Sequence, residues 1–220
     1  KVDAKSDGPL ASLRFTRDQV EELRYAALLH DFGKVAVQEK YLRKGKKLYA
    51  SQLIALRQRF AYILKSIEAD HLRARLRALE SGRLAADELA AIDAEHARRR
   101  EEAERILQAV LSANEPTVVE EESFRAVMNL PRRAFASFEE QLQFPAEAWA
   151  DGPFLAADEV TALSIRKGSL TDAERKEIND HVSHTYEFLR KLPWTGQLRR
   201  IPEIAWAHHE KLDGSGYPRG

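Results

Sequence analysis

Apolar residues recur at intervals of three and four along most of the chain, the spacing that places them on one face of an α-helix. The longest such stripe begins after Tyr49 and runs through Leu53, Leu56, Phe60, Ile63, Ile67, Leu72, Leu76 and Leu79. After a turn at Ser81-Gly82-Arg83, a second stripe continues from Leu84 to Ala113. Two helices of about 30 residues, each about 45 Å long, would form an antiparallel coiled-coil hairpin over residues 49–113.

A shorter helix is predicted before the hairpin. Thr16 and Gln19 have the spacing of a capping box, which marks the start of a helix. This helix is expected to end at His30-Asp31, with Gly33 as the left-handed residue that closes it.

Two more helices are predicted near the C-terminal end of the chain. One runs from Thr171 to Leu189, and the other begins at Pro202, which suits the first turn of a helix. Between these helices and the hairpin, repeated prolines predict an irregular connector over residues 114–164. No segment alternates as a strand would, so the expected fold class is all-α, a helical bundle with an inserted hairpin.

Composition narrows the classes of function. The chain has no cysteine, which excludes disulfides, thiolate zinc sites and cysteine nucleophiles. Its 35 basic residues balance its 35 acidic ones, so neither a long nucleic acid nor an acidic membrane is the expected partner. The charges of the hairpin favour a solvated coiled-coil surface over a nucleic-acid arm, and His71 and His96 are expected on that surface. With no membrane span or export signal in the sequence, the expected location is the cytoplasm.

Five of the seven histidines fall into three short clusters, which are His30-Asp31, His181 with His184, and His208-His209. Taken singly, each has an ordinary explanation, such as a hydrogen-bonded core histidine or a helix end. Taken together, they indicate a nitrogen and oxygen site for a divalent metal such as iron, manganese or zinc. At about 100° per residue, His181 projects near the apolar face of its helix and His184 lies at the edge of that face, so His181 is the stronger candidate.

Three segments carry a resemblance to a known family. The run from Leu28 to Lys34 resembles the signature of the HD superfamily of metal-dependent phosphohydrolases. The run from His208 to Pro218 resembles the second signature of its HD-GYP branch, and Lys167 to Thr171 matches the segment between the two. The resemblance implies an HD-GYP domain in two parts, residues 1–48 and 165–220, separated by the hairpin and the connector.

The resemblance also implies an activity and a set of site residues. HD-GYP proteins hydrolyse cyclic di-GMP to pGpG or GMP with two divalent metal ions, for which iron or manganese is favoured over zinc. By this likeness Asp31 bridges the metals, His30 binds one of them, and the other is bound by His181, His208 and His209. Lys34 would stabilise charge on the phosphate, with Gly216 and Tyr217 at the nucleotide.

The chain departs from the family pattern in two ways. In the family the counterparts of His30 and His181 lie much closer together, whereas 150 residues lie between them here. A further metal-binding histidine upstream of the HD pair and an aspartate downstream of the GYP loop have no counterpart here, so the domain is expected to be incomplete at both ends. An upstream sensor or receiver domain and a homodimer formed through the hairpin are further expectations.

Two alternatives remain open. The chain could be a catalytically inactive HD-GYP signalling or scaffold module that binds nucleotide or protein partners through the coiled-coil arm. A phosphohydrolase acting on free nucleotides fits the HD pair, but it does not account for the GYP loop.

Overall fold

The computed structural model describes residues 7–8, 11–82, 86–118, 121–129 and 154–220, and these residues form helices, turns and loops without a strand. The prediction of an all-α fold is therefore confirmed. The chain divides into two compact units, one made of Lys1–Arg43 with Asp172–Gly220 and the other of Lys44–Thr171. No helix among the described residues has the length and hydropathy needed to cross a bilayer.

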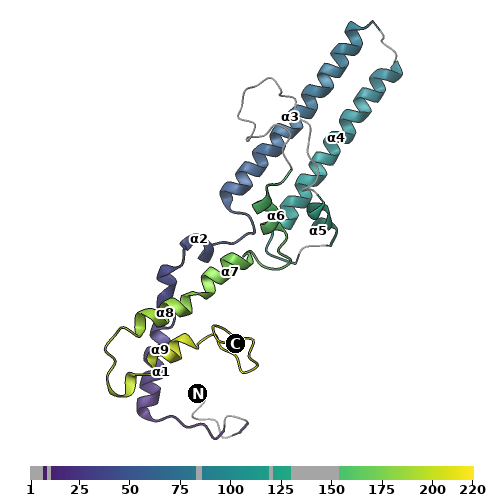
Figure 1. Cartoon of the computed structure of the whole chain (residues 1–220). Coiled ribbons are helices and arrows are strands. Elements are labelled where there is room, and N and C mark those ends of the chain that lie inside the picture. The colour runs from purple at the N-terminus through teal and green to yellow at the C-terminus, as the bar shows by residue number, and fades with distance from the viewer. Residues whose placement is uncertain (1–6, 9–10, 83–85, 119–120, 130–153) are drawn as a thin grey trace. The chain divides into compact units, whose positions relative to one another are not determined.

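The first unit joins the two ends of the chain (Figure 1). Its helices are α1 (Arg17–Leu29), the 3₁₀ helix η2 (Phe32–Ala36), α2 (Glu39–Leu42), α7 (Asp172–Asn179), α8 (His181–Leu189), the 3₁₀ helix η4 (Gly196–Leu198) and α9 (Ile201–Trp206). Their small core consists of Ala26 from α1, Leu189 from α8, and Ile201 and Ala205 from α9. Packing around this core places α9 against both α1 and α8.

Helix α1 begins as predicted and, with His30 as its C-cap, also ends where it was expected to, but Gly33 has a different role. The Thr16 backbone N–H donates to Gln19 Oε1 at 2.9 Å and the Gln19 N–H donates to Thr16 Oγ1 at 3.2 Å, which completes the capping box. Gly33 does not close the helix in the left-handed region, as was expected, because it lies within η2 and is not among the glycines with positive φ. A different constraint requires glycine there: a Cβ at position 33 would lie 2.0 Å from the His181 carbonyl oxygen.

The single helix predicted from Thr171 to Leu189 is divided into α7 and α8, with Asp180 between them. The Ile178 carbonyl at this break contacts His181 Nδ1 at 2.6 Å, so a side chain takes the place of a regular backbone partner. The prediction that His181 lies on a buried face is confirmed, since its side chain is only 1% exposed.

The second unit contains α3 (Ala50–Glu80), α4 (Ala86–Ala113), α5 (Glu121–Met128) and α6 (Ala157–Leu163). Helices α3 and α4 lie side by side as a long hairpin (Figure 1). The base of the hairpin is not a free arm, because Leu56 and Phe60 of α3 share one core with Val127 of α5 and Leu163 of α6.

The predicted apolar seam covers only part of the hairpin. Leu72, Leu76 and Leu79 are 59%, 54% and 50% exposed, so the last third of the stripe does not face α4. Polar contacts join the helices there instead, and His71 Nε2 lies 2.7 Å from Asp93 Oδ1 while the His71 and His96 rings stack at 4.2 Å. These two histidines, which were expected on the surface, therefore lie at the contact between the helices.

The connector over residues 114–164 is less irregular than predicted, since it contains α5 and α6. Helix α5 fits between two of the prolines that set the prediction, and α6 follows the last of them. Both helices contribute to the core that they share with α3 and α4. The part of the connector at 130–153 lies outside the described residues.

Candidate metal centre

Side chains from three separate segments of the chain meet at one place in the first unit. His30 follows the last residue of α1, Asp31 precedes η2, and His181 is the first residue of α8. His208 and His209 follow α9. All five predicted metal ligands are thus brought together, although 150 residues lie between His30 and His181.

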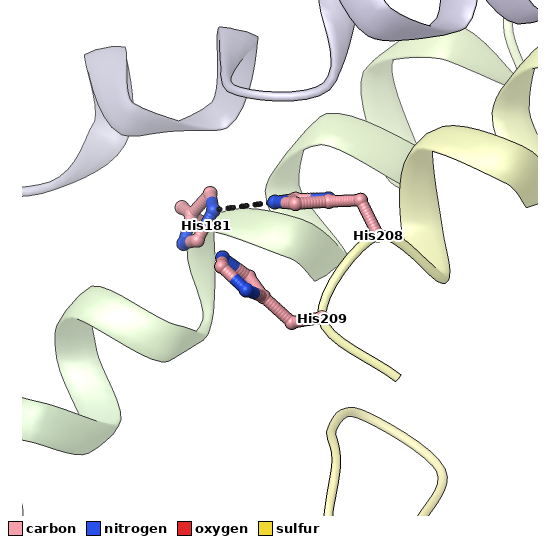
Figure 2. A group of neighbouring side chains, drawn as sticks. All are labelled: His181, His208 and His209. Carbon is pink, nitrogen blue, oxygen red and sulfur yellow. Dashed lines mark hydrogen bonds between the residues drawn. The ribbon is translucent and has the colours of Figure 1, made fainter. Parts of the chain in front are cut away.

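Asp31 lies at the centre of the group. Its Oδ1 is 3.2 Å from His181 Nε2 and 3.8 Å from His208 Nε2, and its Oδ2 is 3.3 Å from His30 Nε2. Figure 2 shows His181, His208 and His209 turned toward one another, with 3.4 Å between the Nε2 atoms of His181 and His208. The candidate ligand atoms form two overlapping groups, each within 4.8 Å: one is His181, His208 and His209, and the other is His30, Asp31 and His208.

Three of the histidines share one hydrogen-bonding arrangement, in which Nδ1 faces the carbonyl oxygen of the residue three positions earlier. The distances are 2.7 Å for His30 and 2.6 Å for both His181 and His208. A carbonyl can only accept, so in each ring Nδ1 carries the proton and donates it. In the neutral rings Nε2 therefore holds a lone pair, and a backbone carbonyl behind the ring is a common support for a metal-binding histidine.

With Nδ1 protonated in these rings, the atoms that face one another at the centre of the cluster are all hydrogen-bond acceptors. Asp31 Oδ1 is buried and has no hydrogen-bond donor among the described residues. The contact drawn between His181 and His208 in Figure 2 joins two Nε2 lone pairs unless one ring becomes charged. A cation at the centre would satisfy all of these atoms, so the residues fit a divalent metal with nitrogen and oxygen ligands.

The electrostatics favour the metal-binding protonation states. Burial lowers the pKa values of His208 and His209 below the ordinary histidine value, and neighbouring histidines lower them further. Burial alone would raise the pKa of Asp31, but the Lys34 hydrogen bond and the charges of His30, Lys34 and His181 outweigh it, and the pKa lies below its usual value. At pH 7 the site therefore offers the Asp31 carboxylate together with the neutral imidazoles of His208 and His209.

The predicted substrate residues lie at the edge of this cluster. Lys34 Nζ donates to Asp31 Oδ2 at 2.7 Å. The Tyr217 ring stacks on His209 with 4.6 Å between centroids, and burial followed by the charge of Asp31 raises its pKa. Gly216 packs against backbone, since a Cβ there would lie 2.4 Å from the Lys211 nitrogen, so its place in the loop depends on having no side chain.

His184 is exposed and lies outside both ligand groups, as its position at the edge of the stripe indicated.

Two buried polar residues near the site, Thr185 and Glu22, were not among the residues predicted from the sequence to have a role in the site. The Thr185 hydroxyl contacts the backbone on both sides of Asp31, and Glu22 Oε1 accepts the Arg200 N–H at 2.8 Å at the start of α9. For Thr185 the sequence signal was a polar residue on a helix face expected to be buried, whereas no pattern in the sequence had placed Glu22 on a buried face.

Comparison with known proteins agrees with this geometry. Residues 134–220 match the family model described as "HD domain", a stretch that includes His181, His208 and His209. Over 59 residues the chain is 41% identical to "3'3'-cGAMP-specific phosphodiesterase 3" of Vibrio cholerae serotype O1, which is 27% of this chain and 12% of that protein. No solved structure matches the chain. The HD-domain match over residues 134–220 and the histidine–aspartate cluster both support a relationship of this chain to the HD superfamily of phosphohydrolases.

Proposed function

We propose that the chain is the catalytic part of a metal-dependent phosphodiesterase that hydrolyses cyclic dinucleotides, with cyclic di-GMP as the first candidate substrate and pGpG or GMP as the product. The observation that carries the proposal is the set of Nε2 lone pairs gathered around the buried Asp31 Oδ1, to which no described residue donates a hydrogen bond. Such a set of acceptors is suited to binding divalent metal ions, and bound metal ions can assist the hydrolysis of a phosphate diester.

Two observations support a cyclic dinucleotide over a free nucleotide. The relative from Vibrio cholerae is named for a cyclic dinucleotide, 3'3'-cGAMP. In addition, the segment from His208 to Pro218 resembles the HD-GYP signature, and its Tyr217 ring stacks on His209 beside the cluster. The choice between cyclic di-GMP and 3'3'-cGAMP is left to experiment.

In such a reaction the residues of the cluster would bind the metal ions, and the backbone carbonyls behind them would orient the rings. His30, Asp31, His181, His208 and His209 would hold the metals, manganese or iron in this proposal, with Asp31 shared between them. Bound metals would lower the pKa of a coordinated water and neutralise charge on the phosphoryl oxygens. The carbonyls of Ala27, Ile178 and Ala205 keep three of the rings in the tautomer that this requires.

Lys34 and Tyr217 would act on the substrate itself. The Lys34 ammonium is half exposed and flexible, so it can leave Asp31 Oδ2 to meet a phosphate oxygen as charge develops there. The Tyr217 hydroxyl is protonated at neutral pH, as is usual for tyrosine, and burial raises its pKa further, so it can donate a hydrogen bond to the nucleotide.

The test is hydrolysis of cyclic di-GMP and of 3'3'-cGAMP by protein loaded with manganese or iron. Asp31→Asn should reduce turnover at least about 100-fold, because even residues behind the metal ligands typically contribute roughly 10–100-fold. Asp93→Asn is the matched control, since Asp93 also contacts a histidine but lies in the hairpin. Undiminished turnover by Asp31→Asn in a sample of verified metal content would overturn the proposal.

The same assay distinguishes the proposed phosphodiesterase from the non-catalytic alternative. A protein that binds a cyclic dinucleotide with its metal site filled, yet never cleaves it, would be a binding or scaffold module. Hydrolysis that disappears with Asp31→Asn and persists with Asp93→Asn would exclude that reading.

A further inference from the structure

The side chain of Thr185 lies where the two distant halves of the metal cluster meet. It is one helical turn after His181 on α8 and is fully buried. Its Oγ1 accepts the Gly33 backbone N–H at 2.8 Å and donates to the His30 carbonyl oxygen at 3.1 Å. One hydroxyl therefore acts as both donor and acceptor for the segment that carries the HD pair.

These two hydrogen bonds enclose Asp31. The His30 carbonyl precedes Asp31 and the Gly33 N–H follows it, so the hydroxyl holds the backbone on both sides of the carboxylate. His181 lies on the same helix, four residues before Thr185, and contributes the Nε2 that is 3.2 Å from Asp31 Oδ1. The hydroxyl thus fixes a distance between ligands that are far apart in the sequence.

The packing around the hydroxyl leaves little room for another arrangement. A Cβ on Gly33 would lie 2.6 Å from the Thr185 nitrogen and 2.7 Å from its Oγ1, so the two backbones are in direct contact. Replacing the hydroxyl by a methyl group would leave the buried Gly33 N–H facing an apolar group in this closed space. The segment that carries His30, Asp31 and Gly33 would then have to move away from α8 for the Gly33 N–H to find another hydrogen-bond acceptor.

We propose that Thr185 is a positioning residue, whose hydroxyl sets the HD pair at metal-binding distance from His181. This inference rests on the metal-dependent function proposed above. The proposed requirement is for the hydroxyl and not for the shape of the side chain. Valine has nearly the same shape as threonine without the hydroxyl, whereas serine keeps the hydroxyl without the methyl group, so the two substitutions separate these properties.

The test compares Thr185→Val with Thr185→Ser in the full chain. Manganese affinity, measured by calorimetry and by the electron paramagnetic resonance of bound Mn²⁺, should fall roughly 10–100-fold in Thr185→Val. Thr185→Ser should restore most of the affinity and the wild-type resonance spectrum. Ser183→Ala, on the same helix and half-buried, is the matched control and should bind manganese as the wild type does.

Measurements are made well below the unfolding temperature, with circular dichroism verifying the fold of each variant. In a sample active on a cyclic dinucleotide, Thr185→Val should lower kcat while KM changes little, because the metal site is displaced and the outer substrate contacts remain. Equal manganese affinity in wild type and Thr185→Val would overturn the positioning role, as would failure of Thr185→Ser to restore affinity.

A wild-type measurement covers the case in which Thr185→Val does not fold. Amide exchange of Gly33, followed by NMR in the metal-free protein, should be as slow as that of neighbouring helical amides, because its N–H is buried and hydrogen-bonded. Rapid exchange at Gly33 would contradict the hydrogen bond directly. If no cyclic dinucleotide is cleaved but the manganese results hold, the positioning role stands and only the proposed reaction fails.

Discussion

Gly33 illustrates how a single residue determines whether the cluster can form. The α8 backbone approaches it so closely that a Cβ would meet the His181 carbonyl at 2.0 Å and the Thr185 nitrogen at 2.6 Å. Both contacts are with backbone, which cannot move aside as a flexible side chain can. The constraint is steric, because the φ of Gly33 is outside the left-handed region.

Gly33→Ala should therefore lower the free energy of unfolding by about 3 kcal/mol, the upper end of the usual range for inserting a carbon into a packed contact. Urea denaturation measures the loss. Gly45→Ala is the matched control, because a Cβ at Gly45 meets nothing within 4 Å. Identical denaturation midpoints for the two variants would show that α8 can move aside without loss of stability.

At the scale of elements, an ion pair holds α6 against α3. Arg59 Nη1 donates to Glu159 Oε2 at 2.6 Å, and their side chains are 14% and 4% exposed. The same Glu159 oxygen accepts the Ala156 N–H at 2.8 Å at the start of α6. The Glu159 carboxylate therefore caps the N-terminus of α6 and also binds α6 to α3.

Glu159→Gln keeps the size of the side chain and removes its charge. It should lower the free energy of unfolding of the second unit by about 3 kcal/mol, since removing one charge of a buried ion pair is strongly destabilising. Thermal unfolding followed by circular dichroism measures this. The exposed pair of Glu95 with Arg98 provides the control, and Glu95→Gln should leave the transition unchanged. An equal response of both variants would mean that the Glu159 charge does not hold α6.

At the scale of the whole molecule, every candidate ligand belongs to the first unit and the hairpin to the second. The two ends of the inserted segment lie together, because the Ser169 hydroxyl donates to the Lys44 carbonyl at 2.8 Å. A short linker can therefore replace residues 45–168. This cut removes α5 and α6 with the hairpin, whose base shares a core with them.

The shortened protein should keep the metal content of the full chain, measured by elemental analysis, because its ligands and Thr185 are untouched. It should also lose self-association in sedimentation experiments, since Leu72, Leu76 and Leu79 form an exposed apolar row on α3 that we expect to meet the same row of a second copy. Introducing Asp31→Asn into the shortened protein controls for non-specific metal. Loss of metal in a shortened protein that remains folded would show that the second unit supports the site.

Local features could be predicted from the sequence because their causes lie within a few residues. The capping box at Thr16 and Gln19 needs only two side chains three positions apart, and Pro202 suits the first turn of α9 for equally local reasons. Helical periodicity likewise identified the buried face of α8 that carries His181. The kinds of residue in the histidine clusters were enough to indicate metal chemistry.

Tertiary structure decided which of these local features meet. Periodicity shows that a helix has an apolar face but not what covers it, so the exposure of Leu72, Leu76 and Leu79 and the contact of His71 with Asp93 became visible only when α4 was in place. The roles of Gly33 and Thr185 depend on a backbone contact across about 150 residues of chain, which no local spacing encodes. The sequence by itself determined the all-α fold class, the helix starts with local signals and the chemical groups available. Packing decided that His30, Asp31, His181, His208 and His209 share one site, because burial and distance depend on the whole fold.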